Sequence, residues 1–277
     1  MQRDVVLEIV TRTDTGKVRS KNEDSVLANV TQGIVVLADG MGGYNAGEVA
    51  SGMATSMLVK WLEDFVAKRE MGGTLPAISA STHTALSAGI AKTNQAIFAA
   101  AQSQAQYAGM GTTLVIGLFQ GNQLTVAHIG DSRAYGLRDG ELIQITRDHS
   151  WLEEKIASGL LTREQAQLSR NKNLVTRAVG IDANVSAEIH DFEVMSDDIY
   201  LFCSDGLNDM VSDKEIGMTL TSLSANLDLC ASQLIQLAND KGGRDNVSVI
   251  LVKVKKLNSN LGSGPLSWWR RLLVRFR

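Results

Sequence analysis

The chain has 277 residues, with 27 basic and 30 acidic side chains, a formal net charge of −3 and 44% hydrophobic residues. This composition is that of a folded globular protein and excludes global disorder. Two cysteines cannot build a disulfide framework, and no apolar run approaches the ~18–20 residues that span a bilayer. The start of the chain lacks the apolar core of a signal peptide, so we expect a cytoplasmic, thiol-reduced protein.

The small net charge hides an asymmetry along the chain. Residues 253–277 contain seven basic side chains and no acidic ones, which leaves 20 basic and 30 acidic residues, a net charge of −10, in residues 1–252. An acidic body of this kind disfavours nucleic acid as a partner and suits a site for cations. Nothing in the sequence demands more than a monomer.

Hydrophobic periodicity predicts an irregular order of strands and helices. In chain order we expect strands at 5–11, 25–30 and 33–38, helices at 46–66 and 78–103, strands at 112–119, 123–128, 133–138 and 141–146, a helical segment at 151–169, strands at 184–194 and 198–203, helices at 213–220 and 225–239, and a strand at 247–254. Asp139-Gly140 predicts a tight hairpin between two of these strands. Consecutive hairpin-linked strands indicate antiparallel sheets, and paired helices indicate outer helical layers, which is an α+β arrangement rather than a doubly wound parallel sheet.

Five acidic segments are the informative motifs, because each places a carboxylate beside glycine or asparagine near the end of a predicted strand. They are RSKNED (19–24), ADGMGG (38–43), HIGDSR (128–133), CSDGLND (203–209) and GGRDNVS (242–248). Carboxylates brought together repel one another unless a cation lies between them, and hard divalent cations such as Mg²⁺ and Mn²⁺ prefer oxygen ligands. Any one segment alone is explained more simply as a turn, so the prediction of a cation site depends on all five segments occurring in one chain.

Taken together and in this order, the five motifs resemble those of the metal-dependent Ser/Thr protein phosphatases of type 2C, and most closely the bacterial members. The resemblance covers roughly residues 5–255. It implies a four-layer α-β-β-α sandwich, in which two antiparallel sheets are flanked by helix pairs. It also implies hydrolysis of phosphoserine and phosphothreonine in proteins, with Mn²⁺ or Mg²⁺ as cofactor, in opposition to a bacterial Ser/Thr protein kinase.

The resemblance assigns roles to individual residues. Asp39 corresponds to the aspartate that bridges two metal ions, and the carbonyl of Gly40 completes the first ion's ligands. Asp205 and Asp245 correspond to ligands of the second ion, and Asp131 to a ligand of a weaker third ion. The acidic pair Glu23 and Asp24 is expected near the metals, largely through water, and Arg19 is expected to bind the substrate phosphate. The expected catalytic residues are Arg19, Asp39 and Asp205.

This chemistry needs no covalent phosphoenzyme, since two cations about 3.5–4 Å apart lower the pKa of a shared water, which attacks phosphorus in line. One position departs from the eukaryotic pattern: Met41 stands where those relatives have a histidine proposed as general acid. Methionine cannot donate a proton, so the leaving oxygen must obtain one from water or another group. His149 and His128 are expected to be structural, and Arg177 to be an ion-pair partner.

Other phosphatase classes are excluded by their motifs. A cysteine phosphatase needs Cys-x5-Arg, but Asp209 and Gln236 stand six residues after Cys203 and Cys230. The metallophosphoesterase pattern Gly-Asp-x-His-Gly and a Walker-type phosphate loop are absent from the sequence. Cys203 is expected to be a small buried hydrophobic residue.

The domain organisation has two parts. Residues 1–256 form the expected catalytic domain, with residues 151–172 where the family carries its flap beside the active site; an ordinary surface helix pair is the alternative. Residues 257–277 form a linker and a basic tail, in which Trp268, Trp269, Leu272, Leu273 and Phe276 share one helical face. Such a tail is typical of peripheral docking on the inner face of a membrane or on a partner protein, and a disordered tail or one docked on the acidic body is the alternative.

Two other functions remain open at this point. A catalytically weak relative that serves as a binding module is disfavoured by the intact set of aspartates. A phosphatase dedicated to an anti-sigma-factor antagonist shares the implied fold, but that group usually lacks the Arg19-x4-Asp24 pattern and carries sensor domains, which are missing here.

Overall fold

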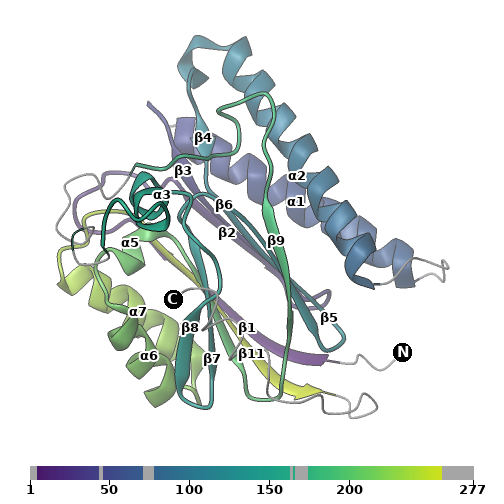
Figure 1. Ribbon diagram of the computed structural model, residues 1–277, viewed down its shortest axis with the longest axis vertical. Coiled ribbons are helices and arrows are strands. Elements are labelled where there is room, and N and C mark those ends of the chain that lie inside the picture. The colour runs from purple at the N-terminus through teal and green to yellow at the C-terminus, as the bar shows by residue number, and fades with distance from the viewer. Residues whose placement is uncertain (1–4, 44–45, 71–77, 163–164, 166–173, 258–277) are drawn as a thin grey trace.

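The computed structural model describes residues 5–43, 46–70, 78–162, 165 and 174–257. Two antiparallel sheets are stacked face to face, and each carries a layer of helices on its outer side (Figure 1). This is the predicted four-layer α-β-β-α sandwich. Within the described residues, none of the helices has both the length and the apolar character needed to cross a bilayer.

Each sheet is assembled from strands that are far apart in the sequence. The first sheet has the order β1-β11-β10-β7-β8, from Val5–Asp14, Val247–Leu257, Ile199–Cys203, Arg133–Arg138 and Glu141–Gln144. The second has the order β2-β3-β5-β6-β9, from Asp24–Asn29, Ile34–Met41, Leu114–Gln120, Gln123–Ile129 and Glu188–Glu193, and β4 (Gly111–Thr112) pairs with the end of β3. The predicted hairpin joins β7 and β8, and Asp139 and Gly140 both have positive φ, as that tight turn requires.

Three apolar clusters hold the four layers together. Between the sheets, side chains such as Leu37, Val115, Tyr200 and Phe202 are fully buried, which agrees with the alternating pattern of the strands that carry them. The helices α1 (Ala46–Glu70) and α2 (Ile78–Ser103) cover the outer face of the second sheet. The helices α6 (Asp213–Ser222) and α7 (Leu227–Asp240) cover the outer face of the first sheet.

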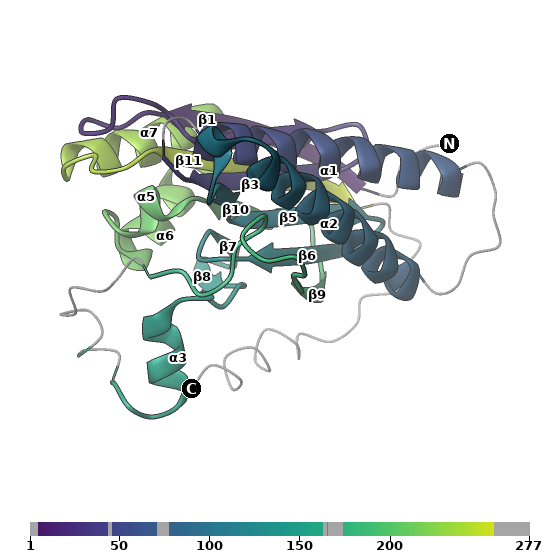
Figure 2. The ribbon, with the colours of Figure 1, turned by 90° about the horizontal axis from the view of Figure 1, so that it is seen from above.

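The helix α3 (Trp151–Ala157) projects away from the sandwich, as Figure 2 shows. It begins at Ser150, whose side-chain oxygen accepts a hydrogen bond from the Glu153 amide, and it ends before Gly159, which has a φ of 72°. The prediction of one helical segment over 151–169 is therefore wrong at residues 158–162. Most of the segment beyond Thr162, up to residue 173, lies outside the described residues.

Other features also differ from the prediction, including the strand expected at 184–194, which spans Glu188–Glu193. The expected strand 112–119 is divided at Thr113, because Thr112 pairs with Gly40 and Val179 while β5 continues along a different part of β3. A short helix, α5 (Asp205–Asn208), follows β10 directly and was not predicted. With the 3₁₀ turn η1 (Ala105–Tyr107), it is too short to leave a periodic hydrophobic pattern in the sequence.

Candidate active site

Seven of the eight predicted site residues meet in one pocket at an end of the sandwich. The pocket has a volume of about 250 Å³, and its lining includes Arg19, Glu23, Asp39, Gly40, Asp131, Asp205 and Asp245. These side chains come from the β1–β2 loop, the end of β3, the β6–β7 turn, the start of α5 and the loop before β11. Five separate segments therefore deliver five carboxylates and one guanidinium to a common space.

The close approach of these segments depends on two glycines. A Cβ atom on Gly40 would lie 2.2 Å from the Gly47 carbonyl oxygen and 2.6 Å from that of Glu23. A Cβ atom on Gly206 would lie 1.9 Å from the Asn246 carbonyl oxygen. Each glycine follows one of the pocket's aspartates, so the Asp-Gly motifs allow backbone segments to pack directly against the pocket wall.

Backbone hydrogen bonds fix the position of Asp39. Its amide donates to Thr113 Oγ1 (3.0 Å), and its carbonyl accepts from the amide of Thr113 (2.8 Å) and from the hydroxyl of Thr112 (2.9 Å). Thr113 Oγ1 also lies 2.7 Å from the hydroxyl of Ser132, beside Asp131. These bonds leave the Asp39 carboxylate directed at the pocket. Through Thr113 and Ser132 they also connect the motif at 38–43 to the motif at 128–133.

Asp24 lies beneath the pocket instead of lining it. Its position pairs directly with Asp39 across β2 and β3, and its Oδ2 accepts a hydrogen bond from the Ser204 hydroxyl (2.8 Å). Its Oδ1 is buried without a hydrogen-bond partner among the described protein atoms. An unsatisfied buried carboxylate oxygen points to a ligand or water at this place.

The pocket stabilises the protonated forms of its buried acids. Burial, followed by repulsion from Asp24 and Asp205, raises the pKa of Asp39 well above its usual range. Burial and repulsion from Asp131 have the same effect on the pKa of Asp205, and burial raises the pKa of Asp131 to about 6. Uncompensated carboxylates at this density are the physical signature of a site for positive charge.

Arg19 is the cationic side chain among the described residues of the pocket lining. Its Nη2 donates to Asp245 Oδ2 at 2.7 Å, and both side chains are partly exposed at the pocket mouth. This hydrogen bond, followed by the attraction of the Asp245 charge, raises the pKa of Arg19 above its ordinary value. The guanidinium is thus held at the entrance by one of the predicted metal ligands.

Two residues that hold the pocket together were not predicted. Asn246 accepts the Glu23 amide (2.7 Å) and donates to the carbonyls of Thr15 and Lys21, so it shapes the whole loop that carries Arg19 and Glu23. Thr113 joins Asp39 to Ser132, as described above. Asn246 stands inside a motif, next to Asp245, whereas no sequence signal identifies Thr113.

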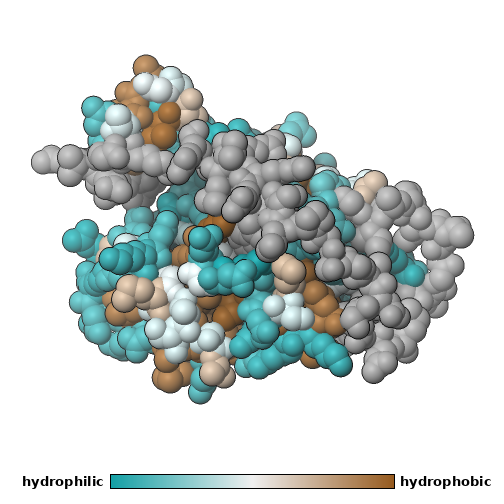
Figure 3. All heavy atoms as spheres, turned by 60° about the horizontal axis from the view of Figure 1, so that its bottom comes forward, coloured by the Kyte–Doolittle hydropathy of each residue, from teal (hydrophilic) through white to brown (hydrophobic). Residues whose placement is uncertain are grey.

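A larger surface groove of about 540 Å³ lies between the β7–β8 hairpin and α6. Its charged lining residues are one acid and one base, Asp213 and Lys214, and it contains none of the predicted catalytic or metal-binding residues. On the face turned forward in Figure 3, hydrophobic and hydrophilic residues are interspersed in small patches. We therefore place the chemistry in the smaller pocket.

The histidines that were expected to be structural do not line the pocket. His128 is 1% exposed, its Nε2 donates to the Arg147 carbonyl (2.8 Å), and its ring stacks on His149 with centroids 4.7 Å apart. Arg177 lies 3.6 Å from Glu188, as predicted for an ion-pair partner. Cys203 is fully buried, and burial raises the pKa of its thiol, so it has no nucleophilic character.

We expect His128 to make the protein sensitive to mild acid. Burial lowers the pKa of His128 to about 4. Between about pH 6.5 and pH 4, this side chain is therefore protonated in the unfolded chain and neutral in the folded protein. Stability should then fall by on the order of 3 kcal/mol between pH 6.5 and pH 4 through this residue. In His128→Gln, which keeps a donor for Arg147, urea unfolding should show a flatter pH dependence; parallel curves for the two proteins would contradict this.

The fold and the pocket define a class: a two-sheet sandwich with an acidic, oxygen-rich site at the ends of its central strands. The family model described as "Protein phosphatase 2C" matches residues 16–239. The chain belongs to the protein phosphatase 2C family.

Named relatives agree with this assignment. The chain is 40% identical over 252 residues to the serine/threonine protein phosphatase PstP of Mycobacterium tuberculosis, covering 90% of this chain and 45% of the relative. It is 39% identical over 245 residues to a serine/threonine phosphatase of Listeria welshimeri, covering 87% and 94% of the two chains. The chain thus spans less than half of the mycobacterial relative and nearly all of the Listeria relative.

A solved structure shows the same fold. The crystal structure of the catalytic domain of PstP in complex with two manganese ions superposes with a TM-score of 0.78 at 38% identity. The match covers 91% of this chain and all of that one. The predicted α+β sandwich is therefore confirmed by the sheet order of the structure and by this similarity.

Proposed function

We propose that this chain is a metal-dependent protein-serine/threonine phosphatase that hydrolyses phosphoserine and phosphothreonine in proteins and opposes a bacterial Ser/Thr kinase. The observation that carries the proposal is the convergence of five carboxylates and Arg19, from five separate segments, on one pocket. Membership of the protein phosphatase 2C family supports it. The names of the relatives from Mycobacterium and Listeria support the same substrate class.

The residues present suit Mn²⁺ or Mg²⁺, with two ions in the core site and a third, weaker ion beside them. The described residues of the lining offer carboxylate oxygens and include no cysteine or histidine, which is the ligand set that hard cations prefer. A bound cation would give the buried Oδ1 of Asp24 a partner and would offset the burial and repulsion that raise the pKa of Asp39 and Asp205. The proposed metal-binding residues are Asp39, Gly40, Asp205, Asp245, Asp131, Glu23 and Asp24.

Bound cations would supply a water of lowered pKa and offset the charge on the phosphoryl oxygens. The protein places the groups that would bind the phosphate and the cations. Arg19 stands at the pocket mouth, where its planar guanidinium can donate two parallel hydrogen bonds to phosphate oxygens. The backbone bonds to Asp39 keep its carboxylate in place without consuming its oxygens. Met41 lines the pocket and offers no proton, so the leaving oxygen must be protonated by water or another group.

Substrate selectivity tests this proposal. Purified protein should release phosphate from phosphoserine and phosphothreonine peptides, with a much lower kcat/KM for a matched phosphotyrosine peptide. A phosphotyrosine peptide hydrolysed as well as the other two would remove the assignment to Ser/Thr phosphatases. Absence of hydrolysis by folded, metal-loaded protein would favour the binding-module function.

We further propose that residues 1–256 are the catalytic domain, with the flap at 151–172, and that residues 257–277 form a separate docking tail. The projection of α3 from the sandwich and its proximity in sequence to pocket residue Val175 support the flap (Figure 2). Residues 258–277 lie outside the described residues, so their proposed role depends on the tryptophan and arginine pattern of the sequence.

Deletion of residues 258–277 is expected to shift the protein from the membrane fraction to the supernatant while leaving kcat on a peptide unchanged. The physical reason is the loss of an apolar face combined with Arg270, Arg271 and Arg277, which favour an anionic surface. Fractionation of cells that express either form measures the effect. An unchanged distribution would remove membrane docking and leave a partner protein or no docking role for the tail.

A further inference from the structure

We propose that Asp148 and His149 act together as a positioning clamp that fixes Asp131 and couples it to the base of α3. The two residues stand just before Ser150, which caps α3, and lie outside the pocket lining. The inference rests on the proposed function, in which Asp131 is a metal ligand. It adds two residues to which that function assigned no catalytic or metal-binding role.

His149 holds the residue before Asp131. The backbone amide of His149 donates to the Gly130 carbonyl at 2.9 Å, and the Gly130 amide donates to His149 Nδ1 at 3.2 Å. Gly130 has a φ of 100°, and a Cβ atom there would lie 2.8 Å from the side chain of Thr113. Both polar groups of this tightly packed residue are therefore bonded to His149.

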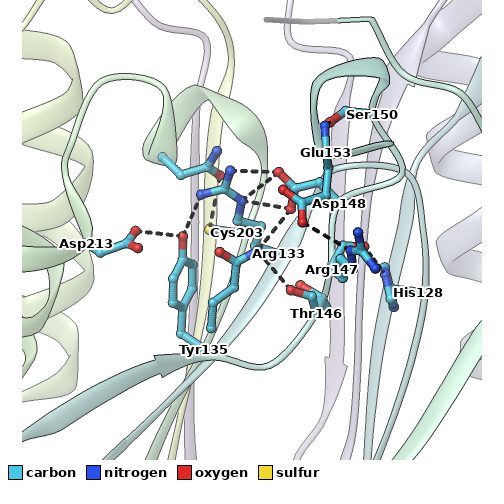
Figure 4. Close-up of polar contacts among 12 residues, drawn as sticks. His128, Arg133, Tyr135, Thr146, Arg147, Asp148, Ser150, Glu153, Cys203 and Asp213 are labelled. Carbon is cyan, nitrogen blue, oxygen red and sulfur yellow. Dashed lines mark hydrogen bonds and ion pairs between the residues drawn. The ribbon is translucent and has the colours of Figure 1, made fainter. Parts of the chain in front are cut away.

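Asp148 holds the residue two places after Asp131. Arg133 donates from Nε to Asp148 Oδ1 at 2.9 Å and from Nη2 to Oδ2 at 2.7 Å, as Figure 4 shows. Gln144 donates to Oδ1 of the same carboxylate at 3.0 Å. Arg133 is held in turn by Tyr135, whose hydroxyl lies 3.0 Å from Nη1. This two-bond, largely buried pair fixes the far side of the turn.

The clamp also forms the base of α3. The Thr176 amide donates to the His149 carbonyl at 2.8 Å, and the Trp151 amide donates to the Leu174 carbonyl at 2.9 Å. Val175, which stands between Leu174 and Thr176, lines the pocket. A displacement of α3 would therefore pull on the segment that holds Gly130 and Arg133, on both sides of Asp131.

A metal ion is not needed to explain the histidines of this region. Among the described residues, His128, His149 and Glu188 form the group whose potential ligand atoms lie within 4.8 Å of one another. Because His149 Nδ1 accepts a backbone N–H, Nε2 carries the proton and donates to Glu188 Oε1 at 3.1 Å. The guanidinium of Arg177 lies 3.5 Å from the same nitrogen and would repel a cation. The cluster orients the His149 ring.

The test compares two isosteric variants by direct Mn²⁺ binding, measured from the electron paramagnetic resonance signal of free Mn²⁺. His149→Asn keeps an acceptor near Nδ1 and loses the Glu188 contact, whereas His149→Gln does the reverse. We expect His149→Gln to lower the Mn²⁺ affinity by about 10–100-fold, and only at the sites whose affinity Asp131→Asn also lowers. His149→Asn should change the affinity of those sites little. The double variant His149→Gln/Asp131→Asn should bind no more weakly than Asp131→Asn alone.

Asp148→Asn tests the other half of the clamp, because it keeps the shape of the side chain and removes the charge that Arg133 binds. It should weaken the same class of ions, with circular dichroism and thermal unfolding in chelator showing that each variant is folded. Unchanged Mn²⁺ binding in both His149→Gln and Asp148→Asn, or losses additive with Asp131→Asn, would overturn the clamp. No Mn²⁺ binding by the wild-type protein would instead overturn the proposed function, so the two failures are distinguishable.

Discussion

Asp39→Asn is expected to lower kcat for a phosphothreonine peptide by on the order of 10⁴-fold while the protein stays folded. Asp39 projects from the end of β3 into a pocket shared with Asp131, Asp205 and Asp245. Its backbone bonds to Thr112 and Thr113 do not involve the carboxylate, so the amide can occupy the same position. The substitution removes the negative charge that would attract the cations. It also replaces one of the two carboxylate oxygens with an amide nitrogen, which is not a ligand for a hard cation.

The same substitution should stabilise the metal-free protein. Burial and the charges of Asp24 and Asp205 raise the pKa of Asp39, which means that the ionised side chain opposes folding when no cation is bound. Thermal unfolding in chelator should therefore give a higher Tm for Asp39→Asn than for the wild type. With Mn²⁺ added, the order should reverse, because only the wild type gains the full stabilisation from binding. A lower Tm in chelator would contradict this account of the pocket.

Asp198→Ala is expected to destabilise the protein by about 3–5 kcal/mol, the usual effect of breaking a buried ion pair. Asp198 is 2% exposed and accepts bonds from Arg138 Nε (2.7 Å), the Tyr200 hydroxyl (3.0 Å) and the Met195 amide (2.8 Å). Removal of the carboxylate leaves a guanidinium and two other donors in the protein interior. For a chain of this size, the loss corresponds to a fall in Tm of about 6–20 °C.

An exposed ion pair in the same chain provides the control. Asp228 pairs with Arg12, and their side chains are 62% and 43% exposed, so Asp228→Ala should cost less than about 1 kcal/mol. Arg138 stands five residues along β7 from Arg133, roughly 17 Å from the pocket end of that strand. Folded Asp198→Ala protein should therefore keep its kcat. Equal destabilisation by the two substitutions, measured by urea unfolding, would show that the buried pair has no special role.

The sequence predicted the architecture well because its strongest signals are local. Alternating apolar residues mark the strands, and the Asp-Gly and Gly-Asp turns mark where the strands end. Asp39 and Asp205 could be identified because Asp39 directly follows a buried apolar run and Asp205 follows another after Ser204. The division of the strand at Thr113 could not, since it results from pairing with Gly40 and Val179, which are distant in the sequence.

The supporting residues of the site were harder to predict for the same reason. Asn246 and Thr113 act through hydrogen bonds to backbone groups of other segments, and such bonds leave no periodic or compositional pattern. The adjacent pair Glu23 and Asp24 was assigned one shared role, but Glu23 lines the pocket while Asp24 is buried beside Ser204. The division arises because Asp24 begins β2 and pairs with Asp39, while Glu23 still belongs to the preceding loop.

The most direct test of the proposed function is phosphate release from a phosphothreonine peptide by purified protein, measured with Mn²⁺, with Mg²⁺ and with chelator, for the wild type and for Asp39→Asn. The carboxylate pocket predicts release by the wild type that requires a divalent cation and is lost in Asp39→Asn. Release that persists in chelator, or that Asp39→Asn retains in full, would show that the pocket is not the catalytic site.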